Sequence, residues 1–92
     1  MGRAARMKPT RLAEKLLRIR IALGLSQNGM IKLMGLTDKI YQSNLSGYET
    51  GEREPPLPVL LKYARTVSVS VEVLIDDALD LPAKLPHSIE RK

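Results

Sequence analysis

The sequence contains no cysteine, tryptophan or phenylalanine, and its only large aromatic residues are three tyrosines. The absence of cysteine excludes a disulfide framework, a thiolate metal site and a cysteine nucleophile. Because aromatic residues are scarce, leucine, isoleucine, valine, methionine and alanine must form the core. Such a chain suits the reducing cytoplasm, which is where we expect it to function.

Long apolar segments are also absent. No run approaches the roughly 18 apolar residues that a membrane helix needs, so we expect no membrane partner. The N-terminal segment is basic, but no apolar stretch follows it, which argues against a secretory signal peptide. A chain of 92 residues is long enough for one domain with a single modest core.

Motifs for catalysis are lacking as well. The sequence has no glycine-rich phosphate loop and no nucleophile motif, and its only histidine, His87, has no partner near it in the sequence. Asp76, Asp77 and Asp80 form an acidic cluster, which we interpret as a solvated helix end rather than a metal site. We therefore expect no catalytic residue, no metal and no cofactor, and we predict that the protein is not an enzyme.

Positive charge is concentrated at the start of the chain. Residues 1–20 contain seven basic residues against Glu14 alone, a net charge of +6, whereas the whole chain carries +5. This distribution indicates either an anionic partner or a solvated, soluble terminus. The basic residues are Arg3, Arg6, Lys8, Arg11, Lys15, Arg18 and Arg20.

A first helix is predicted from apolar residues that recur at spacings of four, three and four, the pattern of one helix face. We expect Thr10 to cap its start and Gly24 to end it. Leu17 and Ile21 fall on a neighbouring face, where they either widen the core stripe or contact a partner. The residues with the helical spacing are Leu12, Leu16, Ile19 and Leu23.

Four shorter helices are predicted after it, separated by glycine and proline. Ser26 is expected to cap the second helix, and the third is expected over residues 42–50. Pro58 suits the first turn of the fourth helix. Ser70 is expected to cap the fifth, which we extend to Ala78. The sequence shows no strand pattern and no repeat, so we predict an all-α fold of five helices.

Several short segments, in this order and spacing, resemble the phage Cro and repressor type of helix-turn-helix domain, the XRE family. The resemblance covers residues 11–76, about two thirds of the chain. The matching segments are residues 24–27 (GLSQ), Gly35, residues 45–51 (LSGYETG), residues 56–57 (PL), residues 60–64 (LLKYA) and residues 69–74 (VSVEVL).

The resemblance implies a five-helix, lambda-repressor-like domain that binds DNA. We expect a basic flexible arm over residues 1–9, the DNA-binding domain over residues 10–80 and a flexible tail over residues 81–92. The function that follows is sequence-specific binding of double-stranded DNA in transcriptional control, with repression favoured. The alternative is an antitoxin or an accessory protein-interaction module of the same fold.

The third helix is expected to enter the major groove with its N-terminal end. Gln42, Ser43 and Asn44 lie in its first turn; Gln and Asn pair with adenine, and Ser donates or accepts a hydrogen bond. The alternative is an ordinary polar helix start. Gly47, one turn later on the same face, permits close approach to DNA or merely close packing. Ser46 completes the base-contact candidates in this helix.

Two further positions follow from the resemblance. Gln27 corresponds to a residue at the start of the second helix that lies against the phosphate backbone, and its alternative role is that of a simple first-turn polar residue. Arg20 and Glu49 correspond to an ion pair between the first helix and the end of the third. We interpret this pair as structural, with a phosphate contact as the alternative for Arg20.

The sequence departs from the family pattern in the second helix, in the connection that follows it and in the loop after the third helix, which is acidic where relatives often carry Lys or Arg. Residues 36–41 are about four residues longer than the family's turn, which makes Lys39 a candidate phosphate contact and leaves Ile40 or Tyr41 to cover the enlarged corner. Ile31 stands where the family prefers a small residue. Arg53, between two glutamates in the loop after the third helix, is a candidate for a phosphate or minor-groove contact, or for a surface ion pair.

A domain this small presents few contacts, so we expect a homodimer on half-sites about 34 Å apart. The dimer surface is expected to use the fifth helix together with Leu79, Leu81 and Leu85. The antitoxin alternative implies a protein partner, a toxin or another regulator, bound through Leu17, Ile21 or the tail.

Overall fold

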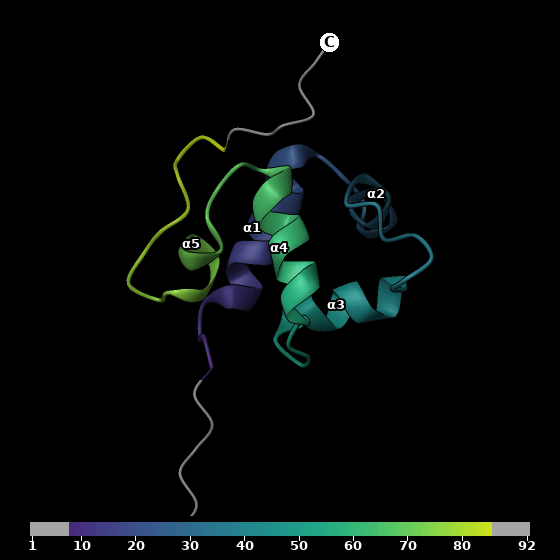
Figure 1. Ribbon diagram of the computed structural model, residues 1–92, viewed down its shortest axis with the longest axis horizontal. Coiled ribbons are helices and arrows are strands. Elements are labelled where there is room, and N and C mark those ends of the chain that lie inside the picture. Colours follow the sequence, from purple (N-terminus) through teal and green to yellow (C-terminus); the bar gives the residue numbers. More distant parts are fainter. Residues whose placement is uncertain (1–7, 86–92) are drawn as a thin grey trace, which may run out of the picture.

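The computed structural model describes residues 8–85, and the predicted five-helix, all-α architecture is confirmed for that part of the chain. α2 and α5 lie on opposite sides of α1, and α3 packs against both α1 and α2 (Figure 1). α5 in turn packs against α1 and α4. The helices are α1 (Leu12–Leu23), α2 (Gln27–Leu33), α3 (Gln42–Thr50), α4 (Leu57–Thr66) and α5 (Val71–Ile75).

The core is largely aliphatic, as the composition requires, with two tyrosines, Tyr48 and Tyr63. Tyr63 of α4 is its largest fully buried side chain, and the Tyr63 hydroxyl has no hydrogen-bond partner within the described residues. Burial raises the pKa of this hydroxyl, so it stays protonated. Leu81 is also buried in the core. The expectation that Leu81 contributes to a dimer surface is therefore wrong, and the segment after α5 packs on the domain at least this far.

Most helix ends form where the sequence indicates. The Ser26 hydroxyl accepts the Gly29 N–H at 2.9 Å, and Gly24 ends α1 in the left-handed conformation with φ 71°. Two expectations are wrong. Thr10 does not cap α1, whose N-cap is Arg11 without a side-chain bond, and α5 ends at Ile75 because Asp76 adopts an extended backbone.

The start of α1 is capped from the other end of the domain. The Asp77 carboxylate accepts hydrogen bonds from the Thr10 N–H at 2.9 Å, the Thr10 hydroxyl at 2.8 Å and the Arg11 N–H at 3.0 Å. Asp80 forms an ion pair with Arg11 at 2.7 Å. Asp77 is thus not the solvated group that we expected, because free N–H groups at a helix start need acceptors and this distant carboxylate supplies them, whereas the Asp80 side chain is 76% exposed as well as paired with Arg11.

Basic side chains at the start of α1 bind backbone carbonyl groups at the end of α5 and just after it. The Lys15 ammonium donates to the Val73 carbonyl at 2.8 Å and to the Asp76 carbonyl at 3.0 Å, and Lys15 is only 1% exposed. Arg11 donates to the Asp77 carbonyl at 2.9 Å. Part of the N-terminal positive charge therefore holds the domain together instead of facing a partner. Arg3 and Arg6 of the predicted arm, and His87, lie outside the described residues.

Replacing Asp77 by asparagine is expected to destabilise the domain at neutral pH. Hydrogen bonds from Thr10 and Arg11 lower the pKa of Asp77 in the folded protein. A carboxyl group with a lowered folded pKa contributes stability above its ordinary pKa, about 4, and loses that contribution as the pH falls through the folded pKa. Urea unfolding at neutral and acidic pH should therefore show a smaller pH dependence for Asp77→Asn than for the unaltered protein.

Asp38→Asn provides the control, because Asp38 is exposed in the loop before α3. It is expected to unfold like the unaltered protein at both pH values. An Asp77→Asn variant with unaltered pH dependence would show that this carboxylate does not couple protonation to folding.

Candidate nucleic-acid interface

α3 presents a short polar surface at its N-terminal end. Leu45, Tyr48 and Glu49 are buried on its inner side, whereas Gln42 and Ser43 are exposed on its first turn. This division follows from the helical repeat, because residues three and four positions apart share a face. The exposed amide and hydroxyl are therefore carried by a helix that the core holds in place.

Asn44 serves the helix start itself. Its side-chain oxygen accepts the Tyr41 N–H at 2.8 Å, which satisfies one backbone donor just before the first turn. The bidentate pairing with adenine that we expected of an asparagine uses both amide atoms, and here the oxygen also holds the Tyr41 N–H. Ser46, two positions later, is half-buried.

An ion pair connects α1 to the end of α3. Arg20 Nε lies 2.6 Å from Glu49 Oε2, and Arg20 Nη2 lies 3.0 Å from Glu49 Oε1. A third donor of the same guanidinium, Nη1, binds the Leu25 carbonyl at 2.9 Å, in the turn before α2. One arginine thus fixes the positions of α1, the start of α2 and the last turn of α3.

The two glutamines extend this ion pair to the surface. Gln27 Nε2 donates to Glu49 Oε1 at 3.0 Å, and Gln42 Nε2 donates to Gln27 Oε1 at 3.0 Å. Hydrogen bonds therefore run from Arg20 through Glu49 and Gln27 to Gln42; we call these four residues the polar relay. The Glu49 carboxylate can only accept, so Gln27 turns its N–H₂ group towards Glu49 and its oxygen towards Gln42, and Gln42 must then donate to that oxygen.

The connection between α2 and α3 is a compact turn. Leu36 and Ile40 are buried at its two ends, and the Ile40 N–H donates to the Leu36 carbonyl at 3.1 Å. Ile40 therefore covers the enlarged corner, and Tyr41, at the N-cap of α3, is 77% exposed. Lys39 is exposed at the crest of the turn. Sequence reasoning missed Tyr41 as a surface residue, because either residue suited the corner.

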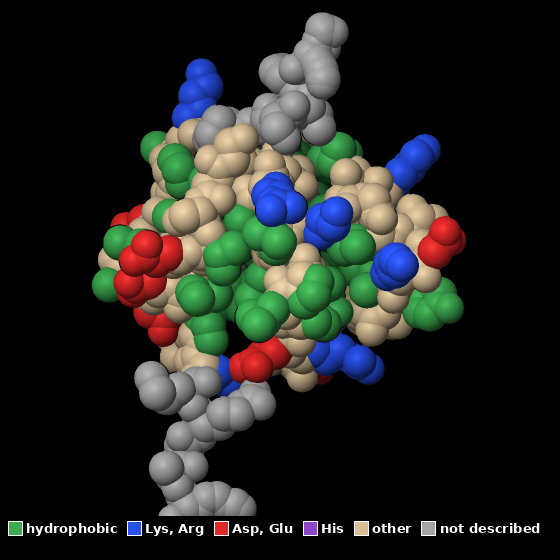
Figure 2. Space-filling view, in the orientation of Figure 1, with side chains coloured by type: hydrophobic (Ala, Val, Ile, Leu, Met, Phe, Trp, Pro, Cys, Tyr) green, Lys and Arg blue, Asp and Glu red, His purple; other side chains and the backbone are tan. Residues whose placement is uncertain are grey.

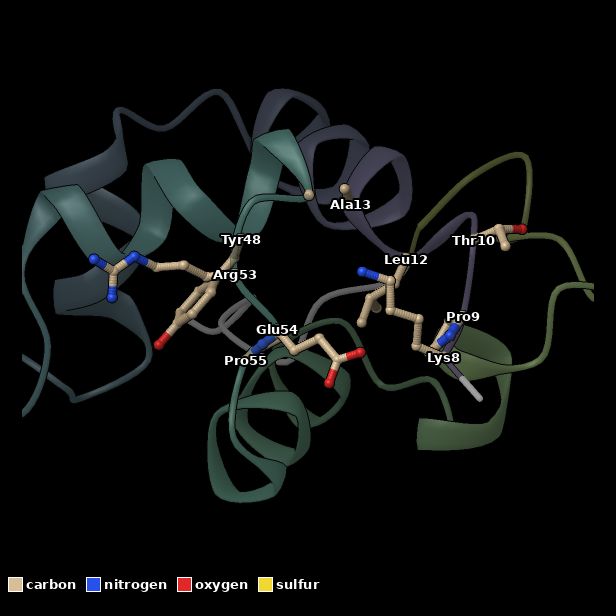
Figure 3. A pocket seen from close by; sticks show the side chains of 10 residues that line it. Lys8, Pro9, Thr10, Leu12, Ala13, Tyr48, Arg53, Glu54 and Pro55 are labelled. Carbon is tan, nitrogen blue, oxygen red and sulfur yellow. The ribbon is translucent and has the colours of Figure 1, made fainter. Parts of the chain in front are cut away.

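Gly47 of α3 packs against the side chain of Arg53, which lies in the loop after α3. Of the two roles considered for Gly47, the structure shows close packing: Gly47 is buried, and the Arg53 stem lies over it. Figure 3 shows Arg53 extending alongside α3 past Tyr48, while Glu54 points in the opposite direction. The pocket drawn there, about 270 Å³, lies between the start of α1 and the loop after α3.

Charge is unevenly distributed over the surface. In Figure 2 acidic side chains gather on the side of α5, whereas Lys and Arg side chains lie over α4 and towards α2.

Among residues 8–85, no three potential metal ligands of the His, Cys, Asp and Glu types come together. No helix in the same range is long and apolar enough to cross a membrane.

Comparison with known proteins matches most of the chain to a family. The profile of the helix-turn-helix family matches residues 16–74, more than half of the chain, and the matched range runs from α1 to the fifth helix. No curated protein and no solved structure matches the chain significantly. The matched range includes all four residues of the polar relay.

Proposed function

This chain belongs to the helix-turn-helix family of the phage Cro and repressor type, which is a family of DNA-binding regulators, and we propose that it represses transcription by reading specific duplex sequences. The observation that carries the proposal is the polar relay. It holds Gln27 and Gln42 together at the adjacent starts of α2 and α3. Side chains oriented before binding lose less conformational entropy when they meet DNA.

In the proposed complex, the first turn of α3 enters the major groove. Gln42 keeps its side-chain oxygen outside the relay, and with Ser43 it faces the base edges; a glutamine there favours adenine. Gln27 lies against the phosphate backbone, where it steadies Gln42 from the side. Lys39, at the crest of the turn, adds a phosphate contact, which contributes affinity and salt dependence but no sequence preference.

The domain division and the homodimer remain proposals. With Leu81 in the core, Leu79 and Leu85 are the half-buried leucines left for a dimer contact beside α5. The alternative function, binding to a protein partner such as a toxin, is favoured by Ile21, which is 63% exposed on α1. We place the protein in the cytoplasm on either proposal.

Selection of binding sites from random duplex DNA tests the proposal. Gln42→Ala and Ser43→Ala are each expected to lose base preference at particular positions of the site, with affinity for the preferred site reduced roughly tenfold or more. Glu14→Gln, exposed on α1 and outside the proposed DNA and dimer contacts, is the control and should keep every preference. Unchanged preferences in both α3 variants would remove the first turn of α3 from the reading surface.

A further inference from the structure

Gly47 stands on the outward side of α3, one turn after Ser43, yet it is buried. The Arg53 side chain covers it: a Cβ atom built on Gly47 would lie 2.6 Å from Arg53 Cδ and 2.9 Å from Arg53 Cγ. No residue with a side chain is compatible with this position of Arg53. A glycine in a helix interior costs about 1 kcal/mol relative to alanine. We therefore infer that Gly47 has a role other than stabilising the helix.

The backbone after α3 brings Arg53 to this place. Gly51 adopts φ 85° and reverses the chain, and the Arg53 N–H then donates to the Gly47 carbonyl at 3.1 Å. Few residues other than glycine adopt such a φ readily. The arginine is thus held at two points, by its own N–H and by the contact of its stem with Gly47.

The guanidinium of Arg53 is directed along α3. Figure 3 shows it beyond the Tyr48 ring, on the side away from Glu54. Burial raises the pKa of Tyr48, and the positive charge of Arg53 opposes that rise, as expected for a nearby guanidinium. Arg53 itself is exposed. The Arg53 guanidinium consequently lies at the surface of α3. The Arg53 side chain occupies the space beside Gly47 that a side chain at position 47 would otherwise fill.

We propose that Gly47 is a seat for Arg53, and that the seated guanidinium reads a guanine in the major groove beside the contacts of Gln42 and Ser43. Arginine suits this role because its planar group donates two parallel hydrogen bonds to O6 and N7 of guanine. The inference rests on the proposed function, since it requires α3 to lie in the groove. It differs from the phosphate or minor-groove contact that the sequence indicated for Arg53.

Four variants test the seat: Arg53→Ala, Arg53→Lys, Gly47→Ala, and the double variant Gly47→Ala/Arg53→Ala. Site selection with Arg53→Ala should lose one guanine preference in each half-site, with about tenfold weaker binding to the preferred site. Gly47→Ala should lose the same preference although Arg53 is present, because the new methyl group displaces its stem. The double variant should bind no more weakly than Arg53→Ala. Arg53→Lys should keep the charge but weaken the guanine preference, because an ammonium lacks the planar fork of the guanidinium.

A stability measurement separates this effect from damage to the fold. Gly47→Ala should unfold at the same or higher urea concentration than the unaltered protein, because alanine favours the helix and a flexible side chain is all that must move. Arg18→Ala, which removes an exposed arginine from α1, is the matched control and should keep the guanine preference.

The outcomes distinguish the inference from the function beneath it. If Gly47→Ala keeps its guanine preference, the seat has no role in reading and the proposal is overturned. If Arg53→Ala weakens binding equally for all sequences and reduces the salt dependence, Arg53 contacts phosphate and the proposal is again overturned. If the unaltered protein shows no preference for any duplex, sequence-specific DNA binding fails as well.

Discussion

Replacing Arg20 by alanine is expected to lower the free energy of unfolding by about 3 kcal/mol, measured by urea denaturation. The Glu49 side chain is only 5% exposed, and Arg20 supplies two of the hydrogen bonds to its carboxylate. Without the arginine, a buried carboxylate keeps only the amide of Gln27. Removing one partner of a buried pair leaves the other charge uncompensated, which is costlier than removing both.

The double variant Arg20→Met/Glu49→Leu separates stability from function. An apolar pair of similar volume often replaces a buried ion pair at little cost, so much of the lost stability should return. The affinity for DNA should nevertheless be lower than that of the unaltered protein, because Gln27 has lost the acceptor that orients it towards Gln42. Unaltered DNA affinity in this double variant would show that the polar relay does not position the glutamines.

The control for the single variant is Arg18→Ala. Arg18 is an exposed arginine on the same helix, and its removal should change the free energy of unfolding by less than about 0.5 kcal/mol. An Arg20→Ala variant as stable as Arg18→Ala would contradict the structural role given to the ion pair.

Replacing Lys15 by alanine is expected to cost about 2–4 kcal/mol of stability, measured in the same way. The substitution leaves a cavity where the fully buried stem packs, and it leaves the Val73 and Asp76 carbonyls without the ammonium. The end of α5 should lose more stability than the other helices, because these two carbonyls belong to its last turn and to the residue that follows.

Lys15→Met divides this loss into two parts. Methionine fills most of the stem's volume but donates no hydrogen bond, so its remaining loss measures the contribution of the ammonium to the carbonyls. We expect it to be intermediate between Lys15→Ala and the unaltered protein. Lys62→Ala, which truncates an exposed lysine of α4, should be close to neutral. A Lys15→Met variant with full stability would show that the bonds to α5 contribute nothing.

The helix positions were predictable because their determinants are local. α3 occupies residues 42–50 as expected, since turn residues precede it and Gly51, which adopts φ 85°, follows it. Ser26 and Ser70 cap the helices that follow them. The exceptions, Thr10 and the end of α5, are places where a distant group intervenes. Asp77 leaves the helical path and turns its carboxylate to the start of α1 instead.

The candidate site was only partly predictable. The resemblance to the Cro and repressor type pointed to Gln27 and Gln42 separately, but no sequence pattern shows that they bond to each other across fifteen positions. The same holds for Arg53, whose neighbours in the sequence are glutamates while its stem contacts Gly47. The roles of these residues on DNA remain predictions that the binding experiments test.

The sequence alone determined where most of the helices begin and end and which side of each is apolar, because backbone preferences and side-chain periodicity act over a few residues. The tertiary structure alone decided which polar groups pair. Lys15 and Asp77 clasp the two ends of the domain, and Glu49 binds both Arg20 and Gln27. The reason is physical: a buried charge or amide is stable only with partners, and folding brings those partners from distant parts of the chain.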